Sequence, residues 1–87
     1  MNWDIEFKRS AAKSLKKIRV EDREKIAQAI IDLQSNPRPT GSIKITNQNA
    51  YRIRQGDYRI IYTINNHKLI IEIIKIGHRR EIYKERH

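Results

Sequence analysis

Cysteine is absent from this sequence, so neither a disulfide nor a thiolate metal site is available to it. Long apolar runs are absent as well, because none approaches the roughly 20 residues that a membrane-spanning helix needs. Residues 1–6 lack the basic and apolar regions of a secretory signal. These absences lead us to expect a cytoplasmic protein that has no membrane partner.

Acidic residues are few relative to basic ones: 10 Asp and Glu stand against 19 Lys and Arg, which gives a net charge of +9. At this chain length the excess suggests a polyanionic partner, such as a nucleic acid, a ribonucleoprotein or an acidic protein. Only 38% of the residues are apolar, but they recur periodically, which indicates a folded chain rather than a disordered basic tail. We expect residues 1–87 to form one domain with a small core.

The first half of the chain predicts a strand followed by two helices. Residues 2–7 alternate between polar and apolar side chains, as in a half-buried strand. Ser10 is a suitable cap for a short helix, and the acids Glu21 and Asp22 suit the positive end of a second one. Very few residues join the helices, so we expect an antiparallel hairpin that ends before Pro37. The inward-facing side chains of this half are expected to be Trp3, Ile5, Phe7, Ala11, Leu15, Ile18, Ile26, Ile30 and Leu33.

From Ile43 onward the pattern becomes that of strands, because β-branched isoleucine is frequent and alternates with polar residues. Gly56-Asp57 is a two-residue hairpin loop, and Asn65-Asn66 is expected to be the loop of the next hairpin. The face that packs on the helices then carries Tyr51, Ile53, Tyr58, Ile60, Tyr62, Ile64, Leu69, Ile71 and Ile73. The predicted fold is α+β: an N-terminal strand, an antiparallel helix hairpin and a three-strand antiparallel meander (β-α-α-β-β-β). The helices pack on one face of a single sheet, and a short C-terminal tail follows.

The opposite face of this sheet gathers arginines. The first loop places Arg54 directly opposite Arg59, with Arg52 on the same face, and the second loop would place Glu72 opposite Arg59. Like charges that face each other across a sheet are destabilising, so such a pair favours an anion at this position. Guanidinium groups grip phosphate oxygens in pairs and stabilise the charge of a phosphorane-like transition state. Binding and cleavage of a phosphodiester is one use of this face, and docking on an acidic partner without catalysis is the other.

Apolar residues share the arginine face. Besides the arginines, we expect it to carry Ile61, Thr63, Ile70, Ile74 and Ile76. Such a face is too apolar to be fully solvated, so the tail after Gly77 is expected to fold over part of it. That tail would bring further candidates to the site, namely His78, Arg79, Arg80 and Tyr83.

Two blocks contain the candidate site residues: residues 51–62, Tyr-Arg-Ile-Arg-Gln-Gly-Asp-Tyr-Arg-Ile-Ile-Tyr, and residues 76–83, Ile-Gly-His-Arg-Arg-Glu-Ile-Tyr. Together with the order of the elements and the helix-ending Asn36-Pro37, they make nearly the whole chain resemble one known family. It is the RelE branch of the RelE/ParE superfamily, the toxins of type II toxin–antitoxin pairs. The resemblance implies a ribosome-dependent mRNA endonuclease (an mRNA interferase) that cleaves in the ribosomal A site and inhibits translation. It also implies a cognate antitoxin as partner, and contact with operator DNA only through the toxin–antitoxin complex.

The resemblance further implies a reaction in which the RNA's own 2′-hydroxyl attacks, without a metal or cofactor. The family's arginines fall on Arg59 and Arg79, its late tyrosine on Tyr83, and its basic, phosphate-binding pair on Arg52 and Arg54. To these we add His78 as a catalytic candidate and Arg80 as a phosphate-binding one. Well-known members have lysines at the first two of these phosphate-binding positions. Arginine stays protonated, so we expect those two residues to clamp phosphate and either the histidine or the tyrosine to transfer the proton. A single carboxylate, Glu72, on the predicted face leaves no paired acids for Mg²⁺.

Other interpretations remain open. A ParE-like toxin inhibits gyrase by binding and cuts no RNA, although that branch usually lacks the arginine cluster and the late tyrosine. A degenerate toxin would act only as an antitoxin-bound co-repressor. The outer lysines of the first helix, Lys13, Lys16 and Lys17, are either a solvated face or contacts to ribosomal RNA. An amphipathic antitoxin helix is expected to cover the basic face beside Ile61, Ile70 and Ile74.

Overall fold

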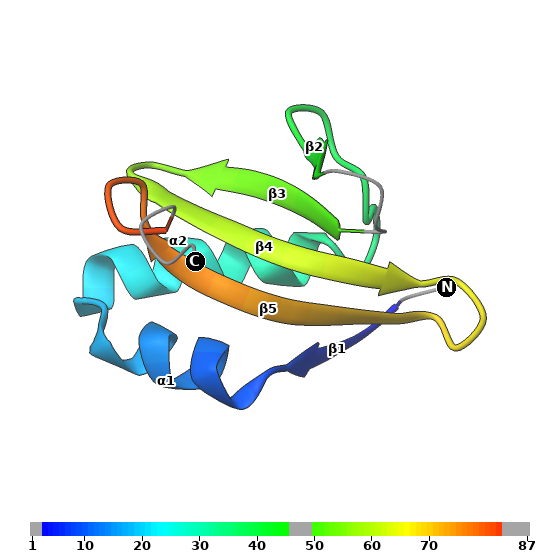
Figure 1. Cartoon of the computed structure of the whole chain (residues 1–87), viewed down its shortest axis with the longest axis horizontal. Helices are drawn as coiled ribbons and strands as arrows, with labels where there is room; N and C mark the ends of the chain where they lie inside the picture. Colours follow the sequence, from blue (N-terminus) through cyan, green and yellow to red (C-terminus); the bar gives the residue numbers. More distant parts are fainter. Residues whose placement is uncertain (1–2, 46–49, 83–87) are drawn as a thin grey trace.

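A five-stranded sheet and two helices form the fold, as described by a computed structural model for residues 3–45 and 50–82 (Figure 1). The elements are β1 (Asp4–Phe7), α1 (Arg9–Lys17), α2 (Val20–Asp32), β2 (Ile43–Ile45), β3 (Ala50–Gln55), β4 (Tyr58–Asn65) and β5 (Ile70–His78). The strand order is β1-β5-β4-β3-β2, with β1 parallel to β5 and all other neighbours antiparallel. The predicted α+β class is confirmed, and the short edge strand β2 adds to the predicted meander.

Both helices cover the same face of the sheet (Figure 1). α1 buries Ala11, and α2 buries Ile26 and Ile30, which are four residues apart and so lie on one helix face. Glu21 and Asp22 lie in the first turn of α2, as predicted. The buried core consists of Ala11, Ile18, Ile26, Ile30, Leu33, Tyr51, Ile53, Ile60, Tyr62, Ile64, Ile71, Ile73 and Ile76. Within the described part of the chain, neither helix is long and apolar enough to cross a membrane.

The β3–β4 hairpin has the predicted register. Gln55 pairs with Tyr58 and Arg54 with Arg59, so Gly56-Asp57 is the two-residue loop. Gly56 has φ +60°, a left-handed conformation that suits glycine and the twist of a tight hairpin. The inward-facing residues of both strands are buried or half-buried, as their alternation predicted.

Two stacked tyrosines tie the segment after α2 to the sheet. The Tyr62 hydroxyl donates to the Pro37 carbonyl at 2.7 Å, and the Arg38 Nε donates to the Tyr51 hydroxyl at 3.0 Å. The two tyrosine rings stack with centroids 5.9 Å apart, and the Arg38 guanidinium lies 5.2 Å from the Tyr51 centroid. Burial, with a smaller contribution from Tyr51, raises the pKa of Tyr62 to about 12.

The β4–β5 connection differs from the prediction. Asn65 pairs with Ile70, so the turn spans residues 66–69 rather than Asn65-Asn66. The reason is the Asn65 side chain, whose Oδ1 accepts the backbone N–H groups of His67 and Lys68 at 3.0 Å each and so stabilises a longer turn. Leu69 has φ +57° and is exposed, so its expected place on the apolar face is wrong.

This longer turn shifts the whole register of β5. Glu72 lies opposite Thr63, and Gly77 lies opposite Arg59, so the predicted Glu72–Arg59 pair is wrong. Ile71 and Ile73 nevertheless face the core, because the register moved by an even number of residues.

A β-bulge at Ile74 then reverses the alternation. Tyr62 pairs with Ile73, but the preceding Ile61 pairs with Lys75, so Ile74 is the extra residue. Beyond the bulge Ile76 is buried, which contradicts its predicted place on the arginine face. Lys75 takes the outward position in its stead, because it pairs with the outward-facing Ile61.

Two predictions at the N-terminal end are also wrong. Ser10 does not cap α1: Lys8 is the N-cap residue, with no side-chain cap hydrogen bond. The Lys8 N–H donates to the Ile73 carbonyl at 2.9 Å, so strand-like pairing continues to the residue before the helix. Phe7 is exposed at the end of the edge strand β1, although Trp3 and Ile5 pack against the core as expected.

Candidate functional site

The outward face of the sheet carries arginines in neighbouring rows. Arg54 lies directly opposite Arg59, as predicted, and Arg52 lies opposite Ile61. Arg54 is exposed and the other two arginines are half-buried. The row therefore places like charges side by side on a surface that a polyanion can reach.

The β3–β4 turn holds two arginines that are distant in sequence. One Nη of Arg59 donates to the carbonyls of Gly56 and Tyr58, at 3.1 and 3.0 Å. The backbone N–H of Arg79 donates to the Asp57 carbonyl at 2.6 Å, and its Nε lies 3.5 Å from Asp57 Oδ1. Arg59 and Arg79 therefore both contact this hairpin turn, and their expected catalytic role stays a prediction.

The sequence assigned Asp57 only to the loop, and its contact with Arg79 was missed. The sequence does hint at this contact, because Asp57 is at the second position of the β3–β4 loop and β5 ends beside that loop. Its carboxylate offsets part of the repulsion between the gathered arginines. The contact is exposed, with 52% of the Arg79 and 64% of the Asp57 side chain accessible, so its contribution to stability is small.

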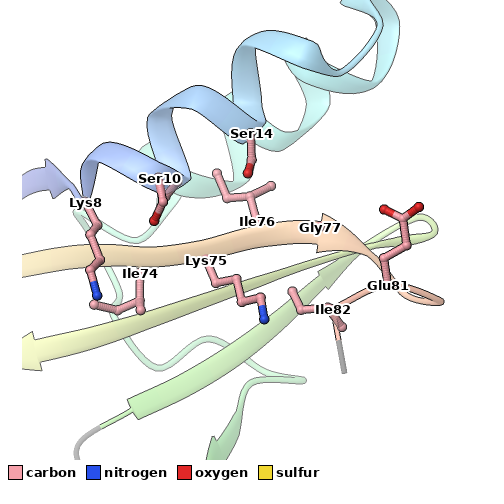
Figure 2. Close-up of a pocket in the computed structure, with 10 residues that line it drawn as sticks. Lys8, Ser10, Ser14, Ile74, Lys75, Ile76, Gly77, Glu81 and Ile82 are labelled. Atoms are coloured by element: carbon pink, nitrogen blue, oxygen red, sulfur yellow. The ribbon is translucent and has the colours of Figure 1, made fainter. Parts of the chain in front are cut away.

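The chain after β5 folds back over the outward face, as predicted. A Cβ on Gly77, which lies opposite Arg59, would be 3.6 Å from Ile82 Cδ1, and Ile82 is buried (Figure 2). Arg80 is exposed at this bend, and its backbone N–H donates to His78 Nδ1 at 3.1 Å. Tyr83 lies outside the described residues, so its expected place beside the arginines stays a prediction.

His78 does not join the arginines. It pairs with Tyr58, whose side chain belongs to the helix-covered face, and the two rings meet edge to face at 5.6 Å. The bulge explains this position, because it reverses which face each later residue of β5 occupies. The expected convergence of His78 with the sheet arginines is therefore wrong, although its chemical role stays untested.

Lys75 is the residue that sequence reasoning missed on the arginine face. It shares a row with Ile61 and Arg52, because Ile61 pairs with both of them. The sequence holds no specific signal of the bulge, because the same strand has a second isoleucine pair, Ile70-Ile71, where the ladder is regular. The face thus contains an amine, which exchanges protons more readily than a guanidinium does.

The helix lysines lie apart from this face. Lys13, Lys16 and Lys17 are exposed on α1, which covers the opposite side of the sheet. In residues 3–45 and 50–82, no group of three or more His, Cys, Asp or Glu residues lies close enough to hold a metal ion.

Residues 5–83 match the family model described as the ParE toxin of the type II toxin–antitoxin system parDE. The chain belongs to the RelE/ParE toxin superfamily. The match includes both arginine-bearing blocks and the whole helix hairpin.

Relatives within the superfamily carry RelE names. A RelE1 protein of Methanocaldococcus jannaschii is 30% identical over 97% of this chain and 98% of its own length. The mRNA interferase RelE of Shigella flexneri is 25% identical over 98% of this chain and 94% of its own. Among solved structures, the RelB–RelE antitoxin–toxin complex from Methanococcus jannaschii matches at 28% identity with a TM-score of 0.77, covering 94% of this chain and 99% of that one. These relatives establish a RelE-type toxin fold over nearly the full chain.

Proposed function

We propose that this protein is an mRNA interferase of the RelE type, a ribosome-dependent endoribonuclease that is neutralised by a cognate antitoxin. The observation that carries the proposal is the arrangement of Arg59 and Arg79 around one hairpin turn, beside Arg52 and Arg54 on the same face. The name of the Shigella flexneri relative gives the activity class, and the RelB–RelE complex gives the kind of partner.

The chemistry follows from what guanidinium groups do to a phosphodiester. Arg59 and Arg79 are close enough to one turn to act on a single phosphate, where they would stabilise the charge that builds as the RNA's 2′-hydroxyl attacks. Arg52 and Arg54 would hold neighbouring phosphates and set the direction of the message. Cleavage within the A site without a metal belongs to this proposal, as does binding of operator DNA only through the antitoxin complex.

The candidates for proton transfer differ from those that the sequence suggested. His78 lies with Tyr58 on the helix-covered side, so it is a poor candidate for a group that meets a substrate on the arginine face. Lys75 shares that face and is a candidate to meet the substrate there, and Tyr83 keeps the role that the family resemblance implied.

Induced expression of the toxin without its antitoxin tests the proposal. The 5′ ends of cellular mRNA are mapped for a message that is translated and for the same message without a start codon. Cuts inside codons that appear only in the translated message are the expected result. Growth arrest without any cuts would contradict the nuclease activity.

Single substitutions link the activity to the arrangement of the arginines. Arg59→Ala and Arg79→Ala should each abolish cleavage while leaving the fold intact, because neither side chain belongs to the buried core. Lys68→Ala is the control, since it also removes one exposed positive charge but lies in the β4–β5 turn, away from the candidate site. Full cleavage by Arg79→Ala would show that the assignment of this residue is wrong.

A gyrase-inhibiting function is the second candidate, because the matching family model is that of ParE. It predicts DNA damage signalling and intact mRNA in the same expression experiment. The arginine face argues against it, since inhibition by protein binding does not need guanidinium groups gathered around one turn.

A further inference from the structure

A groove runs between α1 and the C-terminal half of β5. Its first part, of about 350 Å³, is lined by side chains of both elements and of the tail: Lys8, Ser10, Ser14, Ile74, Lys75 and Ile82. Figure 2 shows Ser10 and Ser14 pointing from α1 toward β5, with Lys8 and Lys75 on either side of Ile74. β1 pairs with β5 only as far as Ile73, so the groove lies along the part of β5 that β1 does not cover.

The groove continues past the end of α1. A second part, of about 540 Å³, shares Ser14 and Glu81 with the first and adds Lys17, Arg19 and His78. The two parts together therefore have four Lys or Arg residues, but Glu81 is their single carboxylate. This ratio of four to one exceeds that of the chain as a whole, with 19 basic and 10 acidic residues. Basic residues therefore outnumber acidic ones along the groove.

The lining chemistry suits phosphate oxygens. Lysine amines attract them as compact positive charges, and serine hydroxyls donate hydrogen bonds to them. Lys75 also lies in the row of Ile61 and Arg52, so the groove is continuous with the arginine face. Lys17, one of the helix lysines, lines its far end. The groove thus connects two basic areas that sequence analysis treated as separate.

We propose that this α1–β5 groove binds the phosphodiester backbone of RNA and extends the RNA contact beyond the arginine face. The inference rests on the proposed function, because it assumes that RNA occupies that face. The groove also gives His78 a place beside RNA, away from the reacting phosphate. The phosphates belong either to the message or to ribosomal RNA, which share this chemistry.

Salt-dependent binding tests the groove without any need for cleavage. Wild type, Lys8→Gln and Lys75→Gln are titrated with a 2′-O-methyl RNA oligonucleotide, with vacant ribosomes and with ribosomes that carry a message. Lys68→Gln is the control, because this exposed lysine lies in the β4–β5 turn, at the opposite end of β5, and its removal changes the net charge equally. Lys75→Arg keeps the charge and should bind as wild type does. Thermal unfolding of each variant verifies its fold.

Log affinity falls with log salt, and each groove variant should make this negative slope shallower by about 0.7, the value for one lost phosphate contact on a single strand. A change with vacant ribosomes identifies ribosomal RNA as the source, and a change only with the oligonucleotide and the loaded ribosomes identifies the message. Slopes equal to that of Lys68→Gln in every arm would overturn the proposal. If wild type cleaves mRNA while the groove variants behave like the control, the proposed function stands and the groove does not. If wild type binds RNA through the groove but cuts none, the groove stands as an RNA-binding site and the proposed nuclease function does not.

Discussion

Arg79 shows how a single residue acquires its place from a contact that lies far away in sequence. Its backbone N–H is fixed to the Asp57 carbonyl, and its guanidinium touches the carboxylate of the same residue. The backbone contact holds the main chain of Arg79 at the turn whatever residue occupies position 57. The Asp57 carboxylate only orients the Arg79 guanidinium, and because this contact is exposed it adds little stability.

Asp57→Asn should therefore slow RNA cleavage by no more than about fivefold, because an exposed ion pair is worth roughly 0–1 kcal/mol. The measurement is the single-turnover cleavage rate on ribosomes. Asp32→Asn is the control, since it also removes one exposed carboxylate that has a side-chain partner, Gln28, and it lies on α2 away from the candidate site. A rate above that of wild type would mean that the Asp57 carboxylate competes with the RNA phosphate instead of orienting Arg79.

Tyr62 is a second residue whose environment makes a quantitative prediction. Its pKa is raised to about 12 in the folded state, while an unfolded tyrosine has its ordinary value of 10.0. The folded state therefore holds the proton more tightly, so the stabilisation is complete below pH 10 and is lost as the pH rises toward 12. The free energy of unfolding should fall by roughly 2–3 kcal/mol across this interval.

Urea unfolding at several pH values measures this fall in the free energy of unfolding. Tyr62→Phe separates the contribution of Tyr62 from that of the titrating lysines. The variant should lose about 1 kcal/mol at neutral pH, because the hydrogen bond to Pro37 is gone, but its stability should decline less between pH 10 and 12. An identical alkaline decline in both proteins would contradict the raised pKa.

At the scale of elements, β5 departs most from its sequence pattern. Alternation alone would place Lys75 inside and Ile76 outside, whereas the bulge at Ile74 buries Ile76 and turns Lys75 outward. The arrangement is favourable, because the isoleucine leaves water and the amine remains in it. One extra residue in one strand therefore decides the chemistry of both the arginine face and the α1–β5 groove.

Deletion of Ile74 should leave the fold intact, because the residue is extra to the β4–β5 ladder and the remaining pairs keep their partners. Deletion of Ile76 is the contrasting variant: it removes a buried isoleucine and moves Gly77 into the core position, which should cost about 2–5 kcal/mol. Urea unfolding compares the two. Equal losses of stability would show that Ile74 is not the dispensable residue of the strand.

At the scale of the whole molecule, the net charge of +9 and the half-exposed isoleucines of the outward face would suit two different partners under the proposed function. RNA would use the positive charge, and the antitoxin would use the apolar area beside it. An antitoxin segment that covers both would exclude RNA by occupying the same face.

Ile61→Asp should consequently weaken binding of the cognate antitoxin by about tenfold or more, as expected for an apolar residue inside an interface. Leu69→Asp makes the same chemical change at an exposed residue of the β4–β5 turn and should bind as wild type does. Isothermal titration measures both affinities. An unchanged affinity of Ile61→Asp would mean that the antitoxin leaves the middle of the arginine face open.

The extent to which sequence predicted the structure depends on the range of the interaction. The β3–β4 hairpin was predicted residue by residue, because a two-residue loop with glycine determines its own register. The β4–β5 hairpin was not, because Asn65 hydrogen-bonds two residues of a longer turn and the bulge lies nine residues further on. Three site arginines depended on the first hairpin and lie where expected, whereas His78 depended on the second and does not.

The sequence by itself determined the fold class, the helix pair and the arginine row, since local periodicity and one tight turn are sufficient for each of them. Only the tertiary structure decided that Asp57 meets Arg79, that Lys75 joins the arginine face and that His78 leaves it. Those placements result from strand register, which is set by competition between backbone pairing and burial over the entire sheet. A one-residue shift in strand register moves a side chain to the other face of the sheet, and no local sequence pattern predicts that shift.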